Sequence, residues 1–417
     1  MMSQRSQGAL RRNAMRFLVC AETQSRAALE EIDSAGQWGE LVELSADWNV
    51  LSGLETRLAA LTIEMPSMER SELGRLASRA FIQSTLCLRA GAKALSTLQQ
   101  AGIHCAGFKG LATLAYLYAG PRSRTLQDVD VLVHPGDVVA ALAALQQVGF
   151  SLSGGGDWEE HLKFVRQSPG AAGNEAVSLT DPEGGAVDLH WRLGCVNVET
   201  ILAGVRSVPI LGRSLPLIGP GHSMLLTAHH ALRNDLVPDD VARDICDFAQ
   251  WEALLNHSPG WDSIRIEAER WGLTQSCLAL ALIVTRIRDS QDHADSSAEP
   301  PFSASRADRN AAGRLSDLYF HQLIEGGLNT DVVYLTSYRP LFQIVSSAAT
   351  GWGKYRDSMR RSEQVNGELS LPLPQRLWRA FMAALRLTPA RWLQVRALAR
   401  AKDGMLRGAG RSRRALP

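Results

Sequence analysis

The sequence lacks the features that mark secreted, disulfide-linked or membrane-spanning proteins. Its six cysteines, in 417 residues, show no Cys-x-x-Cys or other metal-binding spacing, which indicates reduced and mostly buried thiols. The longest apolar run, 277–284, is far too short to span a bilayer. The first residues contain basic side chains but no long apolar stretch of the secretory kind. We therefore expect a cytoplasmic protein without a transmembrane segment.

The chain also lacks a strong overall charge. Its formal net charge is +1, so no global field favours nucleic acid or membrane. One asymmetry is present, because residues 375–417 hold eleven Lys and Arg against a single acid, Asp403. Aromatic residues interrupt this basic tail, so contact with an anionic membrane or with RNA is one interpretation. A docked pair of C-terminal helices with arginines facing water is the interpretation we favour.

Periodicity and helix breakers divide the chain into helical and mixed parts. We find no internal repeat. The predicted regions are an N-terminal helical region (1–100), an α/β core (101–220), a helical domain (221–288), a polar linker or disordered loop (289–313), and a C-terminal helical region ending in the basic tail (314–417).

Short β-branched runs and turn signals predict the elements of the core. Predicted strands are 103–108, 129–133, 161–167, 176–179 and 186–191, with a further small hairpin in "VPILGRSLPLI". Predicted helices are 110–119, before a Gly-Pro stop, and 135–148, with Gly149 as its C-terminal cap.

An acidic pair opens one of these strands. Asp128 and Asp130 share one face because side chains alternate along a strand, and their Cα atoms are about 6.7 Å apart. Two bare charges at that distance repel by about 0.6 kcal/mol in water and about 2.5 kcal/mol at an effective dielectric constant of 20. A divalent cation removes this repulsion, and hard oxygen ligands suit Mg²⁺.

A second acidic strand lies in "AVDLHW", where Asp188 and His190 point to one side. If this strand lies beside the first, a third carboxylate joins the acidic pair. Three carboxylates suit two metal ions around a triphosphate and an attacking hydroxyl. Asp188 is then both a metal ligand and the nearest base for that hydroxyl. His190 has two equally weighted interpretations, as a substrate contact or as a half-buried filler.

The segment before the acidic pair offers groups that bind phosphate. Lys109 and Gly110 stand between a predicted strand and a predicted helix, where backbone N–H groups and a positive side chain converge. Arg122 and Arg124 follow and are candidates for phosphate oxygens. Simpler roles remain open for both: Arg122 as a structural residue, and Arg124 as a local partner of Asp128.

Other charged or aromatic residues have simpler explanations. His229 and His230 lie on one predicted helix, with Asp244 and Asp247 on the next. A His/Asp metal site is conceivable, but a hydrogen-bonded helix pair explains the pattern better. Trp191 is better explained as core than as a platform for a nucleobase.

The order Lys-Gly, Arg-x-x-x-Asp-x-Asp and Val-Asp-Leu-His-Trp resembles the uncharacterised bacterial branch of the polymerase-β-like nucleotidyltransferase superfamily. It is also similar to AbiEii-type toxin nucleotidyltransferases, which share the Lys-Gly turn. The resemblance covers about residues 75–260. It implies an α+β fold with a mixed sheet flanked by helices, and Asp128, Asp130 and Asp188 as catalytic carboxylates that hold Mg²⁺, two ions by expectation.

The resemblance implies transfer of a nucleotidyl group from an NTP to a hydroxyl, with release of pyrophosphate. Better-known members carry Gly-Ser where this chain has Lys109-Gly110, which leaves the donor open among ATP, another NTP and a sugar nucleotide. The acceptor is open as well: a small molecule, a saccharide, a peptide or an RNA end. Two alternatives remain, a non-catalytic nucleotide- or peptide-binding accessory protein on the same fold, and an Asp-x-Asp glycosyltransferase. The mainly helical first hundred residues disfavour the glycosyltransferase.

Overall fold

The computed structural model describes most of the first 289 residues and little after them. The described residues are 4–289 without 119, 168–174, 194–195, 211, 234–237 and 256–259, together with 309–310, 312–313 and 316–317. The basic tail and nearly all of the predicted linker and C-terminal helical region lie outside the described residues.

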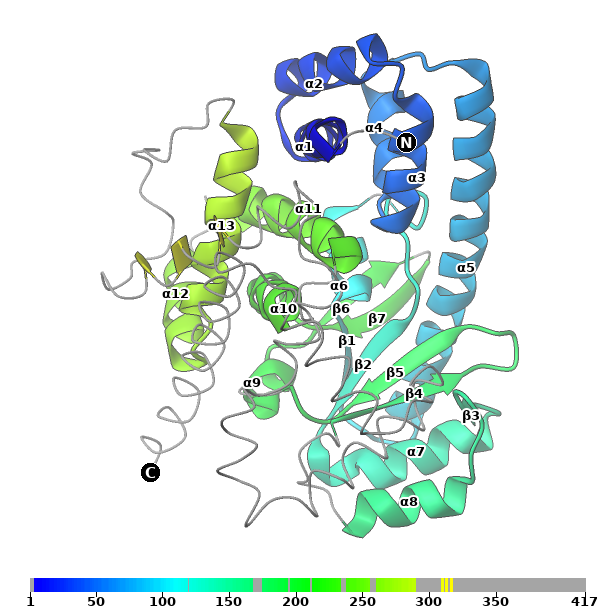
Figure 1. Ribbon diagram of the computed structural model, residues 1–417. Coiled ribbons are helices and arrows are strands. Elements are labelled where there is room, and N and C mark those ends of the chain that lie inside the picture. Colours follow the sequence, from blue (N-terminus) through cyan, green and yellow to red (C-terminus); the bar gives the residue numbers. More distant parts are fainter. Residues whose placement is uncertain are drawn as a thin grey trace, which may run out of the picture.

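A seven-stranded mixed sheet forms the centre of the described chain (Figure 1). Its strands are β1 (Cys105–Phe108), β2 (Val129–Val133), β3 (Ser151–Leu152), β4 (Ala176–Thr180), β5 (Ala186–His190), β6 (Arg206–Ile210) and β7 (Arg213–Leu217). They lie in the order β3-β4-β5-β2-β1-β7-β6. β2 is antiparallel to β1 but parallel to β5, and β7 is parallel to β1. Both predicted hairpins, β4–β5 and β6–β7, are present.

Helices surround the sheet, so the fold is α+β as predicted. Before the sheet come α1 (Gln4–Val19), α2 (Glu22–Ser34), α3 (Trp38–Asp47), α4 (Leu51–Ala60) and α5 (Ser67–Gln100). Between strands lie α6 (Gly110–Leu117), α7 (Val138–Gln147), α8 (Trp158–Gln167) and α9 (Val198–Ala203), with a short 3-10 turn at Pro135–Asp137. After the sheet come α10 (Pro220–Arg233), α11 (Pro238–Leu255), α12 (Trp261–Arg270) and α13 (Thr274–Arg288).

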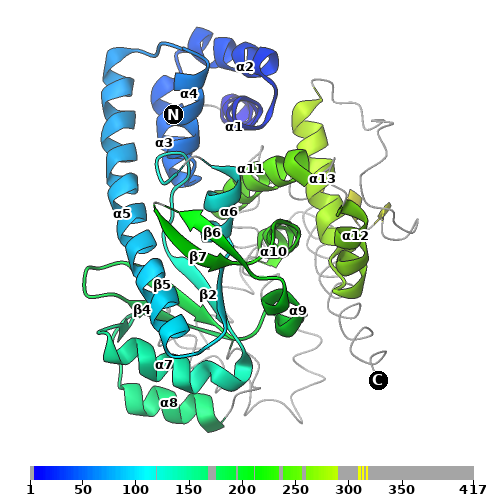
Figure 2. The ribbon, with the colours of Figure 1, turned by 180° about the vertical axis from the view of Figure 1, so that it is seen from behind.

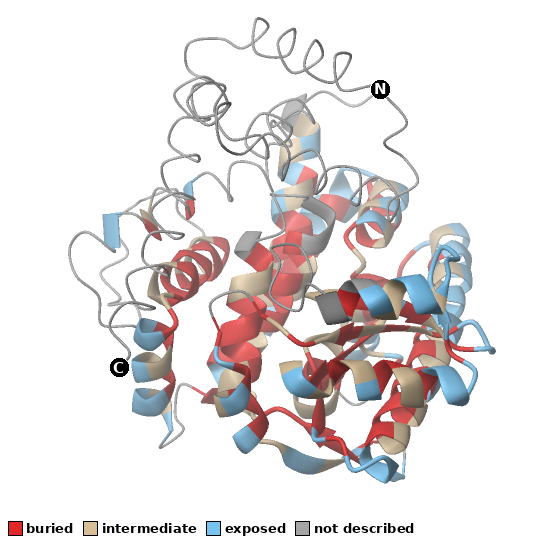
Figure 3. Cartoon of the chain, turned by 90° about the horizontal axis from the view of Figure 1, so that it is seen from below, coloured by how far each residue is buried: buried red, intermediate tan, exposed pale blue. Residues whose placement is uncertain are grey.

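The two faces of β2 belong to two hydrophobic cores. Val129, Val131 and Val133 pack into a core shared with α5 and α7. Leu132 faces the other way, into a core that joins α10–α13 to α1–α4. The long helix α5 crosses the first face (Figure 2), and buried residues line both sides of the sheet (Figure 3). Asp130 therefore lies on the face that looks toward α10 and α11.

The prediction of a strand at 161–167 is wrong, because these residues belong to α8. Trp158, Leu162 and Val165 recur at helical spacing and pack toward the core beside α7. The side chain of Asp157 accepts a hydrogen bond from the backbone N–H of Glu159, which satisfies one free donor of the first turn.

Further predictions concern burial and hydropathy. Trp191 is fully buried, as expected of a core residue. Of the cysteines, the five that fall within the described chain are free and buried. No helix among the described residues combines the length and the apolar character needed to cross a membrane.

Candidate active site

The register of β2 and β5 brings two of the predicted carboxylates together. Asp130 is paired directly with Asp188 on the adjacent parallel strand. Neighbouring strands lie about 4.8 Å apart, so these side chains leave the same face of the sheet as immediate neighbours. On the other side of β2, Phe108 of β1 is paired with Asp130. The next residue, Lys109, therefore leaves the sheet beside the acidic pair.

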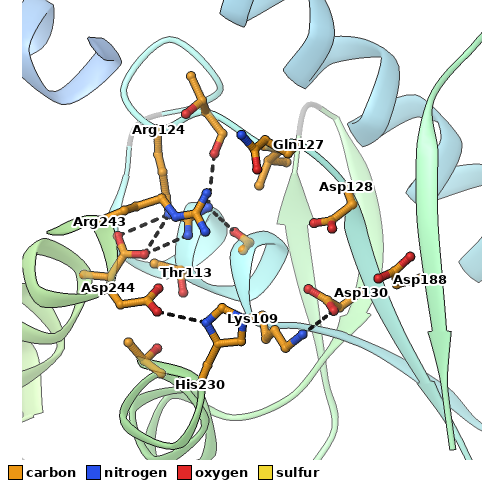
Figure 4. A pocket seen from close by; sticks show the side chains of 15 residues that line it. Lys109, Thr113, Arg124, Gln127, Asp128, Asp130, Asp188, His230, Arg243 and Asp244 are labelled. Atoms are coloured by element: carbon orange, nitrogen blue, oxygen red, sulfur yellow. Dashed lines mark hydrogen bonds and ion pairs between the residues drawn. The ribbon is translucent and has the colours of Figure 1, made fainter. Parts of the chain in front are cut away.

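Asp130 is buried and receives two nitrogen donors on one oxygen. The Nζ atom of Lys109 lies 2.6 Å from Oδ1 of Asp130 (Figure 4). The Nε2 atom of His190 lies 2.8 Å from the same oxygen. Burial alone raises the pKa of Asp130, but Lys109 and His190 outweigh it and hold that pKa well below its usual range. Burial likewise opposes the charge of Lys109, yet Asp130 raises the pKa of the amine.

Asp128 stands one residue before β2 and has the opposite electrostatic environment. Burial, followed by the charges of Asp130 and Asp188, raises the pKa of Asp128 to about 7. Lys109 and Arg243 lower this pKa but do not offset the rise. The site therefore holds one carboxylate, Asp130, whose negative charge is balanced by nearby nitrogen donors, and one, Asp128, whose negative charge is not balanced. Such an imbalance is expected where a cation binds.

Among the described residues, one group of three His, Cys, Asp or Glu side chains has possible ligand atoms within 4.8 Å of one another: Asp130, Asp188 and His190. Two carboxylates and an imidazole suit a divalent cation. The predicted ligand set was Asp128, Asp130 and Asp188, with His190 as a nucleotide contact. Asp128 is not a member of this compact group. The signal for His190 was its place two residues after Asp188, on the same face of the strand.

The turn between β1 and α6 is tightly constrained. Lys109 has φ +46° and ψ −120°, a conformation that a side-chain-bearing residue rarely adopts. A Cβ at Gly110 would lie 3.0 Å from both Arg124 Nη1 and Leu126 Cδ2, so a larger residue does not fit there without movement. The turn thus directs the Lys109 amine toward Asp130 while the N-terminus of α6 faces the cavity.

A cavity of about 260 Å³ connects this acidic cluster with the helices after the sheet. Lys109, Gly110, Asp128, Asp130 and Asp188 line one end of it. The remaining lining residues come from α6, the segment before β2, α10 and α11: Thr113, Arg124, Thr125, Leu126, Gln127, Thr227, His230, Arg243, Asp244 and Asp247.

The comparisons with known proteins agree with this geometry. The model of a family described as "Uncharacterised nucleotidyltransferase" matches residues 34–289. The chain belongs to this family. The match covers the whole sheet and every lining residue of the cavity, and it makes the chain a nucleotidyltransferase by family. No curated protein matches the chain in sequence. The similarity to AbiEii-type toxins stays a resemblance of short motifs.

Two arginines predicted to bind nucleotide have protein partners in this nucleotidyltransferase. Arg124 is buried and forms a two-pronged ion pair with Asp247 of α11, with Nη2 2.7 Å from Oδ2 and Nε 3.2 Å from Oδ1. The hydroxyl of Tyr118 also donates to Asp247, at 2.8 Å. Arg124 therefore joins the sheet side to α11, and its partner is not the nearby Asp128. Arg122 is exposed and lies over the ring of Phe81, 4.6 Å from its centre.

The α10–α11 end of the cavity contains a hydrogen-bonded pair of side chains. The Nδ1 atom of His230 lies 2.9 Å from Oδ2 of Asp244, which agrees with the interpretation of a hydrogen-bonded helix pair. Figure 4 shows His230 and Asp244 on the side of the cavity opposite Asp128 and Asp188. Thr113 and Thr227 add hydroxyl groups to the lining. Sequence reasoning did not select these two threonines, since nothing local distinguishes them from other helical threonines.

Proposed function

We propose that this nucleotidyltransferase moves a nucleoside monophosphate from an NTP to a hydroxyl acceptor, with Mg²⁺ and with release of pyrophosphate. The observation that supports this most is the direct pairing of Asp130 with Asp188 in the sheet, beside Asp128 and Lys109. Carboxylates from two adjacent strands and a lysine at a strand-to-helix turn supply both cation ligands and a phosphate contact.

The residues fit a divalent cation. The cavity is lined by five carboxylates against three Lys and Arg side chains, so it carries two excess formal negative charges with His230 neutral. A triphosphate is repelled by such a cavity unless cations accompany it. Asp130, Asp188 and His190 are placed to hold one ion, and Asp128 is near enough to raise the charge density further. Mg²⁺ bound here would neutralise phosphate charge and polarise the α-phosphate.

The chain's own residues then have distinct roles. Lys109 and the N-terminus of α6 contact the phosphates. Asp188 accepts the proton of the acceptor hydroxyl. The hydroxyl oxygen forms a bond to the α-phosphorus, the bond from that phosphorus to the bridging oxygen breaks, and pyrophosphate leaves with the bonding electron pair. Positioning and charge neutralisation supply most of the rate in such transfers.

The experiment uses purified full-length protein, an NTP labelled at the α-phosphate and a panel of alcohols, saccharides, peptides and RNA ends. We expect Mg²⁺-dependent transfer of label to one acceptor class, abolished by Asp130→Asn. Absence of transfer across the panel, combined with Asp130→Asn binding of metal and NTP equal to that of the wild type, contradicts the proposal.

The same assay separates the two rivals. Tight NTP binding that depends on Asp130, with no turnover on any acceptor, identifies a nucleotide-binding accessory protein. Selective binding of a nucleoside diphosphate sugar over every NTP identifies a glycosyltransferase. The lysine beside Asp130 favours the NTP, because a longer phosphate chain carries more charge for it to compensate.

A further inference from the structure

Four consecutive residues before Asp128 are each tied to another part of the molecule. Arg124, Thr125, Leu126 and Gln127 line the cavity, and their partners lie in α5, in α11 and in the turn between α3 and α4. We call residues 124–127 the acidic-strand lead. The lead enters β2 directly through Asp128, so its position fixes where the backbone of Asp128 lies.

The first and third residues of the lead are held by buried contacts. Arg124 pairs with Asp247 of α11, and its Nη1 donates to the carbonyl of Gly110 at 3.3 Å. The backbone N–H of Leu126 donates to Oγ of Ser84, a fully buried residue of α5, at 2.8 Å. These contacts lie inside the protein, where lost hydrogen bonds cost stability directly.

The side chains of the second and fourth residues both bond Asn49, while the backbone carbonyl of Gln127 accepts a hydrogen bond from Sγ of Cys87 in α5 at 3.1 Å. Asn49 lies in the turn between α3 and α4 and has φ +55°. Its backbone carbonyl accepts a hydrogen bond from Oγ1 of Thr125 at 3.2 Å, and its side-chain Oδ1 accepts one from Nε2 of Gln127 at 2.7 Å. Asn adopts such a left-handed conformation more readily than most residues, so one side chain serves both the turn and the lead.

The bond between Asn49 and Gln127 is exposed, unlike the buried contacts of Arg124 and Leu126. An exposed hydrogen bond between two side chains adds little to stability because water competes for both partners. It does orient Gln127, which lines the cavity and directly precedes Asp128. A contact that adds little to stability but holds the side chain next to Asp128 is suited to a role in positioning.

We propose that Asn49 is a positioning residue of the active site, which acts through Thr125 and Gln127 to hold Asp128 against the repulsion of Asp130 and Asp188. Three carboxylates facing one space repel one another, so without support the Asp128 end of the strand moves away. Support from the helical layer outside the sheet keeps the metal ligands in position for a cation. This lowers the free-energy cost of binding the cation. This inference rests on the proposed function, and it assigns part of the site to the helices outside the sheet.

The test measures binding of Mn²⁺, as a probe for Mg²⁺, by electron paramagnetic resonance of full-length protein with a nonhydrolysable ATP analogue. Asn49→Gly keeps the left-handed turn and removes Oδ1, so we expect Mn²⁺ affinity to fall about tenfold, as for other residues behind metal ligands. Asn49→Asp keeps both the acceptor oxygen and a tolerated conformation, and we expect it to bind Mn²⁺ within about twofold of the wild type.

A double-mutant cycle separates this role from a general loss of structure. Gln127→Met removes the other partner, and we expect the double variant Asn49→Gly/Gln127→Met to lose no more affinity than either single variant. Thermal unfolding temperatures should stay close to that of the wild type. Additive losses, an Asn49→Gly affinity equal to that of the wild type, or an Asn49→Asp loss equal to that of Asn49→Gly would overturn the proposal.

The variant Asp130→Asn distinguishes failure of the role proposed for Asn49 from failure of the proposed function. If wild type binds Mn²⁺, Asp130→Asn does not, and Asn49→Gly matches wild type, only the role of Asn49 fails. If wild type and Asp130→Asn bind equally weakly, the proposed metal-dependent function fails and the role of Asn49 fails with it.

Discussion

At Asp130, a lysine amine and an imidazole meet one carboxylate oxygen, while the neighbouring Asp128 has no such pair of donors within the described part of the chain. The two carboxylates therefore differ in their protonation. Asp130 stays ionised over the whole physiological range because its pKa is lowered. Asp128, with a pKa of about 7, changes charge within that range unless a cation binds.

The raised pKa of Asp128 predicts a pH-dependent loss of stability. The folded state holds the Asp128 proton up to about pH 7, whereas the unfolded state releases it near its ordinary pKa of about 4. Between these values the folded state binds more protons, so the contribution of Asp128 to the free energy of unfolding falls as pH rises. Without metal, we expect Asp128→Asn to match the wild type near pH 4 and to be more stable above pH 7.

Urea denaturation in the presence of a chelator, at pH 4.5 and at pH 8, measures this difference. Addition of Mg²⁺ at pH 8 should raise the stability of the wild type and leave Asp128→Asn less affected. Equal stability of the two proteins at pH 8 without metal would show that burial and the neighbouring carboxylates do not destabilise the charged form of Asp128.

Lys109 gives a second prediction at this scale. Its amine is the closest partner of the buried Asp130, so Lys109→Met leaves a buried carboxylate with His190 alone. We expect a loss of about 1–3 kcal/mol in the free energy of unfolding and loss of NTP binding. Arg89→Met is the control, because the pair of Arg89 and Glu183 is more than half exposed on both sides and should contribute less than about 1 kcal/mol. Similar small losses for both variants would contradict the account.

At the scale of elements, the close packing of α5 against β2 determines how deeply β2, the strand that contains Asp130, is buried. α5 carries Gly91 opposite Val129, and a Cβ at Gly91 would lie 2.5 Å from Cγ1 of that valine. Only a glycine allows the helix to approach the strand between Asp128 and Asp130 this closely.

Gly91→Ala therefore tests the helix–strand contact. The added methyl group forces α5 and β2 apart, and we expect a loss of about 1–3 kcal/mol together with weaker metal binding. Gly74→Ala is a matched control on the same helix, since its added Cβ meets nothing within 4 Å. That variant should gain about 0.5–1 kcal/mol. Unfolding followed by circular dichroism compares the two, and equal effects would exclude the packing argument.

Local sequence signals predicted most strands of the sheet, whereas the order of the strands depends on contacts between distant parts of the chain. The strand at Val129–Val133 and both hairpins carry β-branched runs and turn residues that act over a few positions. The segment 161–167 was mistaken for a strand because its helical spacing begins earlier, at Trp158. The adjacency expected of Asp188 and the acidic pair agrees with the register, but that expectation came from the family resemblance. Nothing local fixes which parallel strand lies beside which.

At the scale of the whole molecule, the candidate active site lies between layers that are distant in sequence. Arg124 and Asp247 are 123 residues apart, and their buried pair joins the segment before β2 to α11. The partner of an arginine at that separation cannot be read from spacing, which is why Arg124 was predicted to bind nucleotide. The cavity exists only when the sheet and the α10–α11 pair are docked together.

Removing one partner of this pair should therefore affect the whole molecule. We expect Arg124→Met to cost about 3–5 kcal/mol, because the carboxylate of Asp247 is left buried without its cation. The double variant Arg124→Met/Asp247→Leu should recover part of that stability, since no charge then stays buried unpaired. Chemical denaturation of the three proteins checks this. A single variant no less stable than the double variant would show that the pair does not hold the layers together.

The most direct test of the central claim is anomalous diffraction from crystals grown with Mn²⁺ and a nonhydrolysable NTP analogue. The account predicts an anomalous peak in contact with the carboxylates of Asp130 and Asp188, with the triphosphate beside Lys109. A peak at another place in the molecule, or a bound nucleotide whose phosphates lie away from this acidic cluster, would contradict it.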